Sequence, residues 1–178
     1  MALPREYVSE DCPIARTLEI VGERWTLLIL RDAFYGVSRF SDFREHLKLP
    51  RAVLTERLNL LVEHGILARA TAASGREEYS LTTKGTALWP TVWSLICWGN
   101  EYYTAQGRQR QYSHADCGGD VPADGVCTAC GARPRPADLT VHPRPWATAK
   151  TDPVSVALSV PHRLLTPITR SPATPSLA

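Results

Sequence analysis

The stretch that decides the fold runs from Leu47 to Leu67 and reads LKLPRAVLTERLNLLVEHGIL. It predicts a short turn, an amphipathic helix, a glycine stop and the start of a strand. We expect Pro50 at the first helical position, where its missing N–H costs nothing. We expect Gly65 in the left-handed conformation that ends a helix. Apolar side chains recur at helical spacing on one face of this helix, at Leu54, Leu58, Leu61 and Val62.

The opposite face of this helix is small and polar near its N-terminus, with Arg51, Ala52, Thr55, Glu56 and Asn59. Such a face suits a helix that enters the major groove of DNA. Because Arg suits guanine and Asn suits adenine, Arg51, Thr55 and Asn59 are the candidates for base edges. Glu56 could accept a hydrogen bond from cytosine or pair with a neighbouring Arg. The alternative is an ordinary surface helix of a helical bundle, so the flanking segments must decide.

Three helical patterns precede this helix. The first begins after a possible N-cap at Asp11 and ends at Gly22, and the second ends at Gly36. A third, short helix opens near Ser38. The three apolar stripes are, in order, Ile14, Leu18 and Val21; Trp25, Leu28, Ile29, Ala33 and Phe34; and Phe40, Phe43 and Leu47. The tight turn between the third pattern and the helix after it predicts a helix-turn-helix core.

Two strand-like runs follow, Leu67 to Ala72 and Glu77 to Leu81, and the turn signal ASGR at 73–76 joins them into a hairpin. Arg76 would lie near the tip of this wing, within reach of a phosphate or the minor groove. Other arginines recur through the first half of the chain, and the candidates for phosphate are Arg24, Arg39, Arg57, Arg69 and Arg76. The alternative for each is solvated surface charge, which we expect for two or three of them.

A long helix is predicted from about residue 83 to 103, with Thr82 as its cap and a kink at Pro90. One face carries Leu88, Val92, Leu95, Ile96, Gly99 and Tyr103, and Trp89, Trp93 and Trp98 widen it. This surface is wider than one partner needs. It therefore predicts that a second copy of the chain packs against the helix to form a homodimer.

Composition excludes several classes of protein. The net charge of +2 is too small to indicate nucleic acid by itself. There is no nucleophile elbow, phosphate loop or recognisable carboxylate pair, so we expect no enzyme. No apolar run could span a bilayer and no signal peptide is visible, which predicts a cytoplasmic protein without a membrane partner. Its five cysteines are then reduced or metal-bound.

Short motifs now combine in a specific order. They are CP at 12–13, GERWTLLIL at 22–30, RFSDF at 39–43, LTERL at 54–58, HGIL at 64–67 and YSLTTKG at 79–85. Together they resemble the HxlR-type winged-helix transcriptional regulators of bacteria, over about residues 10 to 105. The resemblance implies a homodimer on a near-palindromic DNA operator. In some members of that family the cysteine at the position of Cys12 senses oxidants or electrophiles.

Two signals could control such a regulator. Cys12 opens the first predicted helix, where the helix dipole and Arg16 would stabilise a thiolate, and an accessible thiolate suits a redox sensor. The alternative for Cys12 is a half-buried residue that fixes the start of the helix. The other signal is a small apolar effector in a pocket lined by Trp25, Trp89 and Trp93.

A cysteine-rich segment follows, with the pattern H-x2-C, nine residues, then C-x2-C. Its ligand candidates are His114, Cys117, Cys127 and Cys130. The spacing is that of a small zinc ribbon, and four ligands leave no position for substrate, so Zn²⁺ would be structural. The alternatives are free thiols, or a disulfide between Cys127 and Cys130.

The predicted fold class is mainly α (α+β). A winged helix-turn-helix with a long C-terminal dimerisation helix covers residues 1–105. A zinc-ribbon-like module covers 106–142, and its first residues, 106–111, are polar and predict a linker. Residues 143–178 are rich in Pro, Ser and Thr, which predicts a disordered tail. We predict a dimeric, sequence-specific DNA-binding regulator, more often a repressor than an activator. The alternative is an adaptor whose winged helix and zinc module dock a partner protein.

Overall fold

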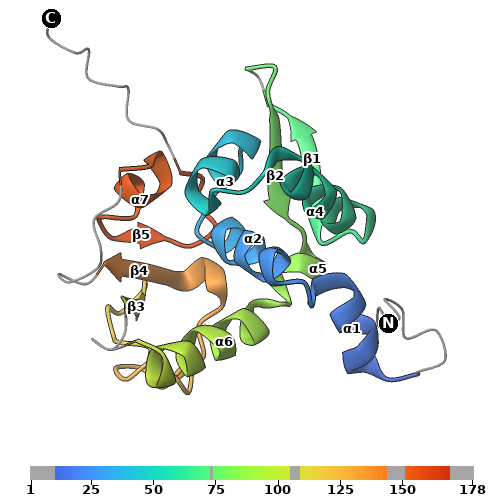
Figure 1. The fold of residues 1–178 in the computed structure, drawn as a ribbon. Helices are drawn as coiled ribbons and strands as arrows, with labels where there is room; N and C mark the ends of the chain where they lie inside the picture. Colours follow the sequence, from blue (N-terminus) through green and yellow to red (C-terminus); the bar gives the residue numbers. More distant parts are fainter. Residues whose placement is uncertain (1–10, 73, 105–108, 144–150, 169–178) are drawn as a thin grey trace, which may run out of the picture.

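The computed structural model of the protein describes residues 11–72, 74–104, 109–143 and 151–168 (Figure 1). Its N-terminal part contains four helices and a hairpin of two antiparallel strands. In chain order these are α1 (Pro13–Val21), α2 (Arg24–Phe34), α3 (Phe40–Leu47), α4 (Arg51–Glu63), β1 (Leu67–Thr71) and β2 (Glu77–Leu81). The hairpin lies beside α4 as the wing (Figure 1). The predicted winged helix-turn-helix is therefore confirmed.

Local sequence explains how α4 is placed. Lys48 takes a left-handed conformation with φ 53° and ends α3, and Pro50 is the N-cap of α4 rather than its first residue. Gly65 has φ 63°, as predicted for the residue that ends the helix. The leucines of the apolar stripe, Leu54, Leu58 and Leu61, are fully buried. The N-cap of α1 is Cys12 rather than the predicted Asp11, and α3 begins after Arg39, near Ser38 as predicted.

The predicted long helix is two helices, α5 (Thr83–Thr86) and α6 (Trp89–Tyr102). Thr82 caps α5, and its hydroxyl accepts a hydrogen bond from a backbone N–H at 3.0 Å. The kink expected at Pro90 is wrong, because Pro90 is the second residue of α6. A missing N–H has no helical partner to lose there. None of the helices in the described ranges is long and apolar enough to cross a membrane.

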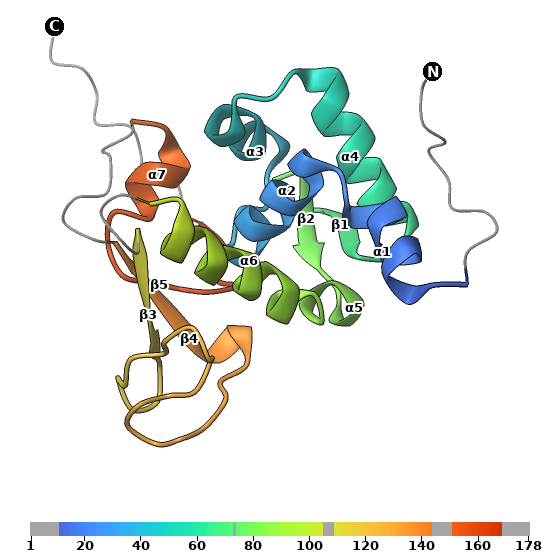
Figure 2. The same ribbon diagram turned by 60° about the horizontal axis from the view of Figure 1, so that its bottom comes forward.

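The chain after residue 109 adds a three-stranded antiparallel sheet in the order β3-β4-β5 (Figure 2). Its elements are β3 (Arg110–His114), the 3-10 turn η1 (Pro136–Asp138), β4 (Leu139–Pro143), α7 (Pro153–Ala157) and β5 (His162–Arg163). Two predictions fail here. Gln111 lies in a strand rather than in a linker, and residues 151–168 form α7 and β5 rather than a disordered tail. The predicted tail residues 144–150 and 169–178 lie outside the described ranges.

Aromatic side chains join the winged helix and the sheet that follows it into one hydrophobic core. The Tyr112 ring lies 4.8 Å from the Trp93 ring, and its hydroxyl lies 2.7 Å from that of Tyr35. Trp89 lies 4.9 Å from Phe34 of α2. Trp89 and Trp93 are therefore buried within one chain, which corrects the prediction that they widen the face offered to a second copy.

The C-terminal segment packs on the connection between α2 and α3. The N–H groups of Leu165 and Ile168 donate to the carbonyls of Phe34 and Gly36, at 2.8 and 3.0 Å. Gly36 has φ 86°, and a side chain there would collide with the backbone of Thr166. Only glycine fits this approach, because it has neither a Cβ nor a penalty for positive φ. The winged helix and its extension thus share one core.

Candidate nucleic-acid interface and metal centre

The polar face of α4 points to solvent. Its five predicted residues, Arg51, Ala52, Thr55, Glu56 and Asn59, are all exposed. The guanidinium of Arg51 lies 5.6 Å from the centre of the Phe40 ring, which holds it at the N-terminal end of the helix. The structure therefore brings these residues together on one accessible surface.

Two predicted phosphate-binding arginines are paired with glutamates of the wing. Arg39 Nε lies 3.1 Å from Glu78, and Arg69 Nε lies 3.7 Å from Glu77. All four side chains are at least 32% exposed. Solvated pairs of this kind contribute at most about 1 kcal/mol, so a phosphate can replace the glutamate.

The other three arginines differ from one another. Arg24 and Arg76 are exposed, and no ion pair joins Arg76 to a carboxylate of the described residues. Arg57 is half-buried between Glu56 at 3.0 Å and Glu23 at 3.8 Å, and its Nε is buried without a hydrogen-bond partner among the described residues. Arg57 thus joins α4 to the start of α2, which suits positioning better than phosphate binding.

A buried charge network at α3 was missed by sequence reasoning. Arg31 donates to the fully buried Asp32 at 2.7 Å, and His46 lies 3.9 Å from the same oxygen. On its other side His46 Nδ1 lies 2.8 Å from Asp152. Burial opposes ionisation of Asp152, but hydrogen bonds from Ser155 and His46 lower its pKa to about 2. The residues of this network come from α2, α3 and the start of α7, so their spacing in the sequence gives no signal that they meet.

The four predicted metal ligands form a cluster between β3 and β4. Their ligand atoms all lie within 4.8 Å of one another. His114 Nδ1 lies 3.2 Å from the sulfur of Cys130 and 3.4 Å from that of Cys117, which is 3.4 Å from the sulfur of Cys127. The carboxylate of Asp116 lies 3.6 Å from the other ring nitrogen of His114. The cluster could hold a metal ion in a tetrahedral site.

The backbone around this cluster favours a thiolate at Cys127. The N–H of Cys130, assisted by that of Ala129, lowers the pKa of Cys127 to about 6 against the effect of burial. Gly119 passes so close that a Cβ there would lie 2.6 Å from the sulfur of Cys127. A metal ion would balance the crowded negative charge, so the donor set and its surroundings fit a metal site.

The predicted redox cysteine has a less specific setting. Cys12 is half-buried at the N-cap of α1, and Arg16 pairs with Glu19 at 3.4 Å. Cys97 of α6 is also half-buried and packs against the core. Redox sensing at Cys12 stays a prediction.

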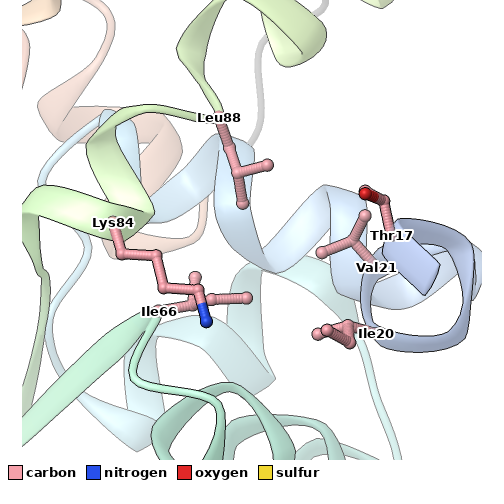
Figure 3. Close-up of a pocket in the computed structure, with 6 residues that line it drawn as sticks. All are labelled: Thr17, Ile20, Val21, Ile66, Lys84 and Leu88. Atoms are coloured by element: carbon pink, nitrogen blue, oxygen red, sulfur yellow. The ribbon is translucent and has the colours of Figure 1, made fainter. Parts of the chain in front are cut away.

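A small hollow of about 110 Å³ lies between α1 and the α5 region (Figure 3). Apolar side chains form most of its wall, and the amine of Lys84 lies at one edge (Figure 3). The lining residues are Thr17, Ile20, Val21, Ile66, Lys84 and Leu88. The effector pocket predicted between Trp25, Trp89 and Trp93 is wrong, because Trp89 and Trp93 are packed in the core.

Comparison with known proteins places this geometry. The family model for the HxlR-like helix-turn-helix matches residues 20–107. Rv3095 of Mycobacterium tuberculosis, an uncharacterised HTH-type transcriptional regulator, is 41% identical over 140 residues, which cover 77% of this chain and 89% of Rv3095. The chain belongs to the HxlR-like helix-turn-helix family. It is a winged-helix transcriptional regulator.

Other similar proteins agree with this assignment. YdeP of Bacillus subtilis, also an uncharacterised HTH-type transcriptional regulator, is 33% identical over 103 residues, covering 54% of this chain and 80% of YdeP. The crystal structure of PA1607, a candidate transcription factor, matches with 35% identity and a TM-score of 0.59, over 79% of this chain and 94% of PA1607. The match to Rv3095 is too long to end at residue 107, so Rv3095 is similar to this chain over part of the segment beyond the family domain.

Proposed function

We propose that this HxlR-like regulator binds a near-palindromic DNA operator as a homodimer. In each copy α4 enters a major groove, and the wing lies against the neighbouring backbone. The observation that carries the proposal is the exposed polar face of α4, with the exposed Arg69 and Arg76 on the wing beside it.

Chemistry assigns a role to each residue of the interface. Arg51 and Asn59 read purine edges, Thr55 reaches a neighbouring base, and Ala52 leaves room for a thymine methyl group. Glu56 lies 3.0 Å from Arg57 and is free to exchange that pair for a cytosine amine. The phosphate contacts are assigned to Arg24, Arg39, Arg69 and Arg76, each adding about one released counterion.

Dimerisation is proposed for an apolar surface that one copy leaves exposed. Trp98 is 53% exposed and its ring lies 5.0 Å from that of Tyr103. The exposed apolar and aromatic side chains of α1 and α6 and the residue after it are Ile14, Leu18, Leu95, Trp98, Tyr102 and Tyr103. A second copy would bury them and hold two α4 helices about 34 Å apart, one turn of DNA. A dimer bound over a promoter would exclude polymerase, so we propose repression.

A structural Zn²⁺ belongs to the proposal. The four ligands of this ion would be His114, Cys117, Cys127 and Cys130. Zinc would hold the loop between β3 and β4 closed. We also propose that a small effector, the second signal predicted from the sequence, would occupy the hollow beside Lys84 instead of the tryptophan pocket.

The test is selection of bound duplexes from a random pool by zinc-loaded, reduced protein. We expect an inverted repeat whose half-site centres lie about one helical turn apart. Methylation of guanine N7 in each half-site should block binding, because that atom faces the major groove. The adaptor hypothesis expects no enriched sequence, and that outcome would overturn the proposal.

A further inference from the structure

The His/Cys cluster is built into the core that supports the DNA-binding domain. Cys127 is 1% exposed and belongs to that core. Two residues before His114, Tyr112 contacts the rings of Trp89 and Trp93. Trp93 also donates to the carbonyl of Ala123, in the loop that carries the cluster, at 3.1 Å. A change at the cluster therefore reaches α6 directly.

A second route leads from the cluster to α2. His114 pairs with Leu139 across the β3-β4 ladder. Leu139 accepts a hydrogen bond from Leu164 at 2.9 Å, and the next residue, Leu165, donates to Phe34 at the end of α2 at 2.8 Å. This contact lies just before the connection to α3, which positions α4. The cluster thus supports the helix-turn-helix from two sides.

The sulfurs of the cluster differ in accessibility. Cys117 and Cys130 are exposed residues, whereas Cys127 is buried. The sulfurs of Cys117 and Cys127 lie 3.4 Å apart. An accessible sulfur next to a second, buried sulfur is the arrangement in which one sulfur reacts with an oxidant and the other resolves the product.

We propose that Cys117 and Cys127 are a site of oxidation by hydroperoxides. Their oxidation releases the metal and lowers DNA affinity, and Cys12 is not needed for this response. The inference rests on the proposed function for its DNA readout. It makes the extension a sensor for the regulator rather than a passive support.

Oxidation of the two cysteines by hydrogen peroxide proceeds in two steps. The Cys117 thiolate attacks one oxygen of hydrogen peroxide, the O–O bond breaks, and a sulfenic acid and hydroxide form. The Cys127 thiolate then attacks the sulfenic sulfur, an S–S bond forms, and a second hydroxide leaves. Two thiolates lose two electrons, peroxide gains them, and solvent protonates both hydroxides. With two of four ligands joined, the site no longer binds zinc.

The experiment uses zinc-loaded full-length protein in which Cys12→Ser and Cys97→Ser leave only the ligand thiols. Hydrogen peroxide is titrated, and three readouts follow: zinc released to a chromogenic chelator, disulfide mapping by mass spectrometry, and the unfolding midpoint. Anisotropy on the selected operator is the fourth. We expect one zinc released per chain, a Cys117–Cys127 disulfide, a lower midpoint, and a loss of affinity of about tenfold or more. Dithiothreitol with added zinc should reverse all four changes.

Three outcomes would overturn the inference. Zinc retained by this double variant, while peroxide still blocks DNA binding by the wild type, would move the sensor to Cys12 or Cys97. Unchanged DNA affinity after zinc release would refute the coupling, and a Cys127–Cys130 disulfide would refute the assigned pair. Zinc release, disulfide and midpoint are read without DNA. They therefore judge the modification site even if reduced protein shows no preference for any operator, which would refute the proposed function alone.

Discussion

Val154 and Val156 lie two residues apart in α7, yet Val154 is fully buried and Val156 is 51% exposed. We predict that Val154→Ala destabilises the whole protein and that Val156→Ala does not. Because both residues belong to the same short helix, the two substitutions change helix propensity by the same amount. The difference between the two variants therefore isolates burial against the winged helix.

The magnitude follows from the burial of Val154. Two buried methyl groups contribute about 1.6 kcal/mol of transfer free energy, at about 0.8 kcal/mol each. The cavity left behind raises the cost to about 2–3 kcal/mol. For a chain of this size that lowers the melting temperature by roughly 4–12 °C. Val156→Ala should change the free energy of unfolding by less than about 0.5 kcal/mol.

Thermal and urea unfolding followed by tryptophan fluorescence measures this difference. Trp89 and Trp93 report on the core of the winged helix, far from α7 in the sequence. A single transition, shifted in Val154→Ala alone, is the expected result. If Val154→Ala loosens α7 to protease but leaves the tryptophan transition in place, the C-terminal segment is not part of this core and the reasoning is refuted.

Three further predictions concern the metal, pH and assembly. Gly119→Ala should weaken zinc binding in a chelator competition, because the new Cβ would lie 2.6 Å from the sulfur of Cys127; equal affinity would contradict the site geometry. Asp152→Asn keeps an N-cap but removes a carboxylate whose folded pKa, about 2, lies below its unfolded value of about 3.9. The wild type should thus be the more stable above about pH 4, and the gap should close as pH falls through about 2; a gap that persists in calorimetry at low pH would disprove this. Leu95→Glu with Trp98→Glu should yield monomers in sedimentation, whereas an unchanged dimer would place the interface elsewhere.

Local periodicity accounts for what could be predicted. The stripe of Leu54, Leu58 and Leu61 and the stop at Gly65 depend only on neighbours in the sequence, and the structure confirms them. The ligand cluster was also predictable, because each pair of ligands is three residues apart and only one approach is long-range. Apart from the approach of the two ligand pairs, these features need no knowledge of tertiary contacts.

Tertiary contacts explain the failures. α7 has five residues and β5 has two, too few for a period to emerge against a Pro- and Ser-rich background. Their flanking residues are held by contacts more than 100 residues away in the sequence. Asp152, the N-cap of α7, contacts His46, and Leu165 and Ile168, which follow β5, donate to Phe34 and Gly36. The sequence predicts a dimerisation surface at Trp89 and Trp93 because nothing local shows that Tyr112 covers them. Tyr112 belongs to the segment that the composition assigns to a separate module.

The central claim is that α4 reads DNA through its exposed face. The direct measurement is an anisotropy titration of the selected duplex and a scrambled duplex with wild type, Arg51→Ala with Asn59→Ala, and Arg135→Ala. The control is Arg135→Ala, which also removes one positive charge, but from the loop between β3 and β4, far from α4 (Figure 2). We expect the double variant to lose its preference for the selected duplex, at a cost of about 1–3 kcal/mol per base contact, while Arg135→Ala keeps it. A double variant that still prefers the selected duplex by the wild-type factor would show that α4 does not read the DNA sequence.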